Sequence, residues 1–349
     1  MFRLREALPT DVESILDVAR HLDSVNLPHD EGAIKALVAG SVAAFSQDQE
    51  TFKREYLFVL EEMATGKVVG TSMIHAQHGT RRSPHVYFDI THEEHYSETL
   101  DRHFEHRLLR IGYNYNGPTE IGGLVLQPAL RTSPERLGKQ LSYVRFLFMG
   151  AHRDWFRSEV ISELMPPLEE DGTSLLWEAL GRRFTGLSYQ EADRISSTNK
   201  EFIRTLFPQD PIYTVLLPAP VQAIIGVVGE ETRGVEHMLR KIGFSFANRI
   251  DPFDGGPHFI AKTDDITLVR QTRNATVFEL GEARRAAGGL EHMGLVAIER
   301  AEAPRFVAVQ GRFLLEGAHV GLEPPLAAAL GVVAGDRVIV LPFEEAARA

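Results

Sequence analysis

The order of apolar repeats along the first 182 residues constrains the fold more than any other feature of this sequence. Segments with a period of two indicate strands, and segments with a period of 3.6 indicate helices. The order is a strand, two helices, a β-hairpin, a strand, a loop, a long helix, a strand and a helix, at residues 2–5, 10–22, 31–45, 56–74, 120–126, 131–138, 139–149, 160–164 and 174–182. This alternation predicts an α/β fold.

Composition excludes several classes of protein. The chain has 349 residues and no cysteine, which excludes disulfides, thiolate metal sites and a cysteine nucleophile. Its 37 basic and 48 acidic residues give a formal net charge of -11, and no run of Lys or Arg offers a nucleic-acid surface. The N-terminus has no apolar signal region, and no apolar stretch reaches the ~18–20 residues of a membrane span. We therefore expect a cytoplasmic protein with no nucleic-acid and no membrane partner.

Two further patterns indicate the domain organisation. Leu176–Phe184 is similar to Met238–Phe244, and each pattern predicts a helix that ends at a glycine before an aromatic residue, which favours a partly duplicated α/β unit. From about residue 265, short apolar runs between glycines and prolines predict a small C-terminal β-barrel. These runs are Ile266–Val269, Ala275–Phe278, Phe306–Val309, Phe313–Leu315 and Arg337–Leu341. The expected domains are 1–190, 191–265 and 266–349.

The element order resembles the GNAT superfamily of acyl-CoA N-acyltransferases. Five stretches resemble the arginine N-succinyltransferase family in the same order, namely His21–Pro28, Leu147–Met149, Leu180–Phe184, Asp210–Thr214 and Asn248–Pro257. The resemblance implies a GNAT-like mixed sheet with helices on both faces. It also implies transfer of a succinyl group from succinyl-CoA, as co-substrate, to the α-amine of arginine or a related basic amino acid, with no tightly bound cofactor.

The same resemblance indicates residues for coenzyme A. In the superfamily, a glycine-rich loop places backbone amides and a helix N-terminus around the CoA pyrophosphate. Here Arg136 stands where the first glycine is expected, Gly138 follows, and Arg131 is nearby. Arg136 either obstructs the amides or binds a phosphate through its guanidinium. Leu124, with Leu126 on the same strand, is expected to contact succinyl-CoA through its backbone, although periodicity alone would place both in the core.

Proton transfer has two candidate positions. Glu120, at the start of its strand, can take a proton from the attacking amine, and the alternative is a solvated strand-end charge. The resemblance implies a proton-donor histidine where this chain has Gly229. Glycine cannot protonate the departing CoA thiolate, although a thiol with a pKa of about 8.5 is a good leaving group. Glu230, Glu231 or His237 could replace the histidine, or could simply lie on the surface.

Charged residues elsewhere are candidates for binding the substrates. Asp251 and Asp254 could bind a guanidinium or ammonium group, or they could cap their own turn. Arg182 and Arg183 could bind the succinyl carboxylate, or they could complement a helix dipole.

Histidines are concentrated in one segment. Seven of the 14 histidines lie between His75 and His106. On a helix, His92-x-x-His95 and His103-x-x-His106 would each share a face that could bind zinc. The segment has no complete zinc-protease pattern, and such clusters are usually solvated polar faces, so we expect no metal.

Two alternatives come from other functional classes. The absent histidine also fits a catalytically idle paralogue that serves as a subunit of a hetero-oligomer. The barrel also fits a ligand-sensing module. A homo- or hetero-oligomer is expected in either case.

Overall fold

The computed structural model describes residues 1–21, 27–81, 83–196, 199–281 and 290–343. The chain forms two compact units, each built from separate segments. Unit 1 comprises Met1–Ala76, Ile121–Ser158 and Thr263–Ala349, and unit 2 comprises Gln77–Glu120 and Glu159–Lys262. The domain boundaries expected at residues 190 and 265 stay a prediction. Within the described part of the chain, no helix combines the length and the apolar character that a membrane crossing needs.

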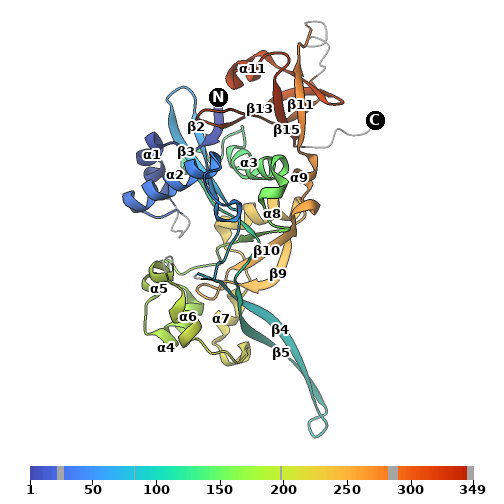
Figure 1. Cartoon of the computed structure of the whole chain (residues 1–349). Coiled ribbons are helices and arrows are strands. Elements are labelled where there is room, and N and C mark those ends of the chain that lie inside the picture. The colour runs from blue at the N-terminus through green and yellow to red at the C-terminus, as the bar shows by residue number, and fades with distance from the viewer. Residues whose placement is uncertain (22–26, 82, 197–198, 282–289, 344–349) are drawn as a thin grey trace. The chain divides into compact units, whose positions relative to one another are not determined.

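Unit 1 contains an α/β sheet and a small barrel (Figure 1). Its strands are β1 (Phe2–Glu6), β2 (Glu55–Glu62), β3 (Lys67–His75), β6 (Thr119–Leu126), β11 (Arg273–Phe278), β12 (His292–Glu299), β13 (Phe306–Glu316), β14 (His319–Leu322) and β15 (Arg337–Pro342). Its helices are α1 (Val12–Ala19), α2 (Glu31–Phe45), α3 (Leu137–Ala151), α9 (Thr267–Gln271) and α11 (Pro324–Leu330). The strand order in this unit is β12-β15-β11-β14-β13-β1-β2-β3-β6.

Both faces of the sheet in unit 1 are covered by helices. Alternate residues of a strand point to opposite faces. Leu57 and Val59 of β2 belong to the apolar cluster that α1 and α2 form. Tyr56 and Phe58 instead contact Phe148 of α3, with ring centroids 4.8 and 5.4 Å away. The expected placement of helices on both faces is therefore confirmed for this unit.

The last five strands close into the expected barrel. The ring of pairs is β12–β15, β15–β11, β11–β14, β14–β13 and β13–β12. The first of the five sequence-predicted strands, Ile266–Val269, is wrong, because these residues lead into helix α9. A run of four residues, three of them apolar, is too short to show a period, so the pattern could not distinguish a strand from a buried helical turn. The other four runs lie in β11, β13 and β15 as expected.

Unit 2 is a second α/β sheet. Its strands are β4 (His85–Ser97), β5 (Arg102–Asn114), β7 (Glu159–Glu163), β8 (Ile212–Tyr213), β9 (Ser245–Ile250), β10 (Pro257–Lys262) and the first two residues of β6. Its helices are a π-helical turn (Trp177–Gly181), α4 (Arg182–Thr185), α5 (Tyr189–Ser196), α6 (Glu201–Leu206), α7 (Ala219–Ile224) and α8 (Arg233–Lys241). The strand order is β6-β7-β10-β9-β4-β5-β8. The core is centred on Trp177, whose ring stacks on Phe253 at 4.9 Å.

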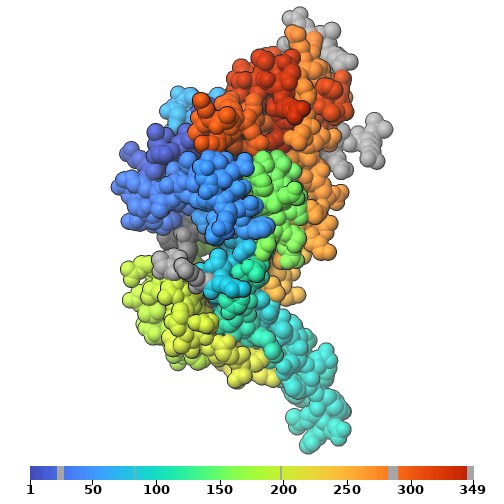
Figure 2. Space-filling model, viewed as in Figure 1, coloured from blue at the N-terminus to red at the C-terminus, as the bar shows by residue number. Residues whose placement is uncertain are grey.

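The histidine-rich segment forms a long hairpin that no sequence pattern predicted. β4 and β5 pair antiparallel from His85↔Asn114 to Ser97↔Arg102. The distal part, with Tyr96 and Leu100 exposed, stands clear of the rest of unit 2 (Figure 2). His92 and His95 lie on β4, where residues three apart point to opposite faces. The helical ligand pair considered from the sequence therefore does not exist.

The sequence predicted that two helices end at a glycine before an aromatic residue. This prediction is confirmed for Met238–Phe244 and wrong for Leu176–Phe184. Gly243, with φ 111°, follows α8 and precedes Phe244 and β9. Gly181 instead lies inside a helix that continues to Thr185 and ends at Gly186, with φ 72°. A Cβ at Gly181 would lie 2.3 Å from an atom of the Trp177 ring. The glycine therefore makes room for the buried indole rather than ending the helix.

Substituting Gly181 by alanine should therefore destabilise the protein. We expect Gly181→Ala to lower the free energy of unfolding by about 1–3 kcal/mol, as overpacked cores do. Gly234→Ala on α8 is the control, because a Cβ there meets no atom within 4 Å; that variant should be neutral or gain up to ~1 kcal/mol. Urea denaturation measures both, and an unchanged midpoint for Gly181→Ala would contradict this account.

Candidate functional site

A buried cluster of ionisable groups lies in unit 2, where β6 begins beside β7. The two strands run parallel, with Thr119 opposite Val160 and Glu120 opposite Ile161. Glu120 is only 4% exposed, and its Oε2 contacts Nδ1 of His78. The alternative of a solvated strand-end charge is therefore wrong, because burial and an imidazole partner hold this carboxylate in place.

Glu163, at the end of β7, is the centre of the cluster. Its Oε1 lies 2.9 Å from Nε2 of His85, 3.5 Å from Nε2 of His258 and 4.0 Å from Nε2 of His78. His85 opens β4, and His258 on β10 pairs directly with Glu163 across the sheet. Three imidazoles, two from the histidine-rich segment and one from the distant strand β10, thus surround one carboxylate oxygen.

The electrostatics of the cluster follow from burial and mutual charge. Burial, and then the charge of His78, lower the pKa of His85 to about 3, so this ring is neutral at pH 7. Burial alone would raise the pKa of Glu163, but His258, His85 and His78 together hold it well below its usual range. Burial also lowers the pKa of His258. The cluster therefore combines an ionised carboxylate with neutral rings at His85 and His258.

Asp251 and Asp254 cap the turn between β9 and β10. Oδ1 of Asp251 accepts the backbone N–H of Phe253 at 2.6 Å, and Oδ1 of Asp254 accepts that of Gly256 at 2.7 Å. Burial, and then the charge of Glu163, raise the pKa of Asp251 to about 7. Burial and the neighbouring Asp251 raise the pKa of Asp254 well above its usual value. The turn-capping role is therefore present, and a role in binding substrate stays a prediction.

Gly229 lies against the chain that leaves β7. Its N–H donates to the carbonyl of Met165 at 2.8 Å, and its φ of -64° is open to any residue. A Cβ at Gly229 would, however, lie 2.7 Å from the carbonyl oxygen of Pro166. The constraint is therefore close backbone contact and not an unusual backbone angle. Of the possible replacements for the absent histidine, Glu230, Glu231 and His237 are all exposed.

The segment expected to hold coenzyme A lies in unit 1, at the start of α3. Arg136 precedes the helix with φ 52° and ψ 51°, a left-handed conformation that favours glycine. Within the described residues, the backbone N–H groups of Leu137 and Gly138 have no recorded partner. A Cβ at Gly138 would meet no atom within 4 Å. Free amides and open space together are what an anion at a helix N-terminus requires.

Strand β6 leads into this segment. Leu124 is half-buried and Leu126 is buried, so the strand is in part a core strand, as periodicity predicts. Between Glu120 and Leu124, Gly123 adopts φ 54°. Arg131 donates through Nε to the carbonyl of Leu126 at 3.3 Å, which ties the loop to the end of the strand. Contact of Leu124 or Leu126 with an acyl-CoA stays a prediction.

The two arginines predicted to bind the succinyl carboxylate lie on α4. Both are exposed, and Nη1 of Arg182 lies 3.0 Å from Oε2 of Glu178, one helical turn earlier. This i,i+4 pair and the position in the last helical turn match the alternative of a helix-dipole partner. A role for Arg182 or Arg183 in binding stays a prediction.

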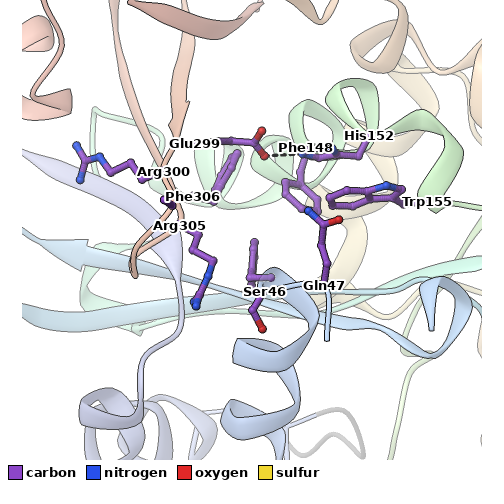
Figure 3. A pocket seen from close by; sticks show the side chains of 11 residues that line it. Ser46, Gln47, Phe148, His152, Trp155, Glu299, Arg300, Arg305 and Phe306 are labelled. Carbon is purple, nitrogen blue, oxygen red and sulfur yellow. Dashed lines mark hydrogen bonds and ion pairs between the residues drawn. The ribbon is translucent and has the colours of Figure 1, made fainter. Parts of the chain in front are cut away.

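A separate cavity of about 280 Å³ lies in unit 1 (Figure 3). Aromatic residues of α2, α3 and β13 line it together with His152, Glu299 and Arg305. None of the sequence-predicted site residues lines this cavity. Its volume is slightly below the ~300–1,000 Å³ of typical ligand pockets.

Sequence reasoning missed His78, His85, Glu163 and His258. His78 and His85 lie in the histidine-rich segment, but Glu163 and His258 are far along the chain, so spacing along the sequence does not associate the four residues. One usable signal was a carboxylate that interrupts an apolar strand, because Glu163 follows Val160 and Ile161. A charge in such a strand requires partners.

Restoring a histidine at Gly229 should destabilise the protein, because the side chain would collide with the backbone of Pro166. We expect Gly229→His to cost about 1–3 kcal/mol. The control Glu230→His adds the same ring at the adjacent exposed position and should be close to neutral. Thermal melts of both variants provide the measurement, and equal melting temperatures would show that the loop has room for the ring.

Comparisons with known proteins agree on one family. The family model described as the arginine N-succinyltransferase beta subunit matches residues 2–268. The chain is 32% identical over 344 residues to arginine N-succinyltransferase of Yersinia enterocolitica, covering 98% of this chain and 97% of that protein. It is also 32% identical over 346 residues to arginine N-succinyltransferase of Escherichia fergusonii, covering 97% and 96%.

A solved structure supports the same assignment. Arginine/ornithine succinyltransferase subunit AI from Pseudomonas aeruginosa matches with a TM-score of 0.83 and 28% identity, covering 99% of each chain. The expected fold class, an α/β fold with a small C-terminal barrel, is confirmed. This chain belongs to the arginine N-succinyltransferase family.

Proposed function

We propose that this chain transfers the succinyl group of succinyl-CoA to the α-amine of arginine or a related basic amino acid. The observation that carries the proposal is membership of the family along 98% of the chain. The free amides and open space at the start of α3 support the binding of an acyl-CoA pyrophosphate. Arg136, exposed beside these amides, would add a cation for a phosphate.

The proposed reaction needs no covalent enzyme intermediate. The neutral α-amine attacks the thioester carbon, a C–N bond forms, and the C–S bond breaks as coenzyme A leaves as a thiolate. The proton of the amine passes to a carboxylate, and the thiolate takes a proton from solvent. Because a thiolate with a pKa of about 8.5 leaves readily, the reaction tolerates glycine at position 229. Positioning of the amine against the thioester would supply much of the acceleration.

Glu120 is the carboxylate we propose as base. It lies on β6 four residues before Leu124, the proposed contact for succinyl-CoA. His78 contacts one of its oxygens and holds the side chain in one orientation. For the amino-acid substrate, we propose Asp251 and Asp254, because each uses its Oδ1 in the turn and a bound guanidinium would relieve the repulsion between the two carboxylates.

A thiol-release assay tests the reaction and its rivals together. We expect release of free coenzyme A from succinyl-CoA with arginine or a related basic amino acid, faster than from acetyl-CoA or with neutral amino acids. We also expect succinyl-CoA to raise the melting temperature, since a ligand that binds only the folded state stabilises it. A higher melting temperature with succinyl-CoA, but no turnover with any amine, would favour the idle paralogue. Binding of arginine without binding of CoA would favour the sensor, and no response to either ligand would contradict all three.

The role of Glu120 has a matched control. Glu120→Gln should lower kcat by about 10²–10⁴-fold, the usual contribution of a positioned base, with a smaller change in KM. Glu55→Gln is the control, because Glu55 also lies on a strand with its Oε1 3.2 Å from a histidine Nδ1, in this case that of His75. Steady-state kinetics of both folded variants measure the effect, and an unchanged kcat in Glu120→Gln would remove this residue from the mechanism.

A further inference from the structure

The imidazole cluster around Glu163 has more buried polar atoms than its own contacts satisfy. Both ring nitrogens of His258, Nδ1 of His85 and Nε2 of His78 are buried without a hydrogen-bond partner, while Nε2 of His85 lies 2.9 Å from Oε1 of Glu163. His85 is 2% exposed and His258 is not exposed at all. Buried polar groups without partners are costly, so their concentration at one point requires an explanation.

The contact between Glu120 and His78 fixes which nitrogen of His78 faces the cluster. Nδ1 of His78 contacts Oε2 of Glu120, and a carboxylate on the far nitrogen of a metal-binding histidine holds its ring in one orientation. Nε2 of His78 is then the nitrogen that can face Oε1 of Glu163, which lies 4.0 Å away.

The geometry around this point matches a metal ion of ordinary size. With metal–ligand bonds of about 2.0–2.1 Å, tetrahedral ligand atoms lie about 3.3 Å apart. Here Oε1 of Glu163 is 2.9 Å from Nε2 of His85 and 4.0 Å from that of His78. One ligand atom of each of the three side chains lies within 4.8 Å of the other two. Small side-chain rotations would bring all three to bonding distance of one ion.

We propose that His78, His85 and Glu163 form a binding site for a divalent transition-metal ion, with Glu120 orienting His78. Two imidazoles and one carboxylate are a ligand set that zinc takes in proteins, with a further position left open. The carboxylate on the far nitrogen of a ligating histidine is the usual second partner in such sites. His258 and Asp251 also lie near Glu163, and one ligand atom of each of these three side chains lies within 4.8 Å of the other two. The proposal does not depend on the succinyl-transfer activity.

This site differs from the histidine pairs that the sequence made prominent. His92, His95 and His103 lie exposed on the β4–β5 hairpin, and each faces a single carboxylate there. Exposed pairs of this kind bind metal weakly and without defined geometry. Substitutions of these histidines provide matched controls, because they remove an imidazole from the chain and leave the buried site unchanged.

The test is direct metal binding by the full chain after treatment with a chelator. Titration with Zn²⁺ against a chromophoric competitor at neutral pH should show one tight equivalent, and Zn²⁺ should raise the melting temperature. Replacing Zn²⁺ by Co²⁺ should give the visible absorption of a four- or five-coordinate ion. His78→Gln and Glu163→Gln should each weaken Zn²⁺ binding by more than 100-fold, and Glu120→Gln should weaken it by about 10–100-fold. His92→Gln and His103→Gln should bind like the unchanged protein.

Several results would overturn the proposal. One is that the protein binds no stoichiometric Zn²⁺. Another is that His78→Gln binds Zn²⁺ as tightly as the unchanged protein. A third is that only the hairpin variants His92→Gln and His103→Gln lose Zn²⁺ binding. The first would mean that a proton shared among the rings, and no metal, bridges the cluster. His78 is 19% exposed on its side chain, so its substitution is the least disruptive to folding. Circular dichroism confirms the fold of each variant before titration.

Discussion

A half-buried negative charge at the end of β7, with its Oε1 turned away from solvent, is the constraint on which the site in unit 2 depends. Glu163 cannot stay ionised in that position without polar partners, since an isolated buried carboxylate is strongly disfavoured. The partners come from the loop before β4, from β4 itself and from β10. The sheet order β7-β10-β9-β4 therefore also brings His258 of β10 and His85 of β4 to the charge of Glu163. Glu120 extends the same network to β6 through His78.

Most of the elements in the first 182 residues, apart from the β4–β5 hairpin, and most of the barrel strands could be predicted from the sequence, because their apolar periods are local. The pattern failed where local signals are ambiguous. Ile266–Val269 is too short to show a period, and the glycine at 181 resembles a helix end although it accommodates Trp177. The β4–β5 hairpin was missed because its distal residues are polar on both faces, so no alternation marks the strands.

The site was predictable only in part, for a different physical reason. Glu120 and the start of α3 lie on recognisable elements, so their roles could be proposed from position. Glu163 and His258 meet His78 and His85 only through pairing between distant strands, and no spacing in a single sequence encodes that pairing. The loop at Gly229 shows the same limit, because the backbone of Pro166 that excludes a side chain there is 63 positions earlier in the chain.

The barrel has a consequence for how the protein can be divided. β13 pairs with β12 and β14 inside the barrel and also with β1, where Leu4 lies opposite Ala308. The family model ends at residue 268, before any barrel strand begins. A fragment cut at that point would leave β1 with an open row of backbone N–H and C=O groups, a template for self-association. A shortened protein should therefore not end at the family boundary. Strand β13 of the barrel pairs with β1 and so covers the edge of the sheet.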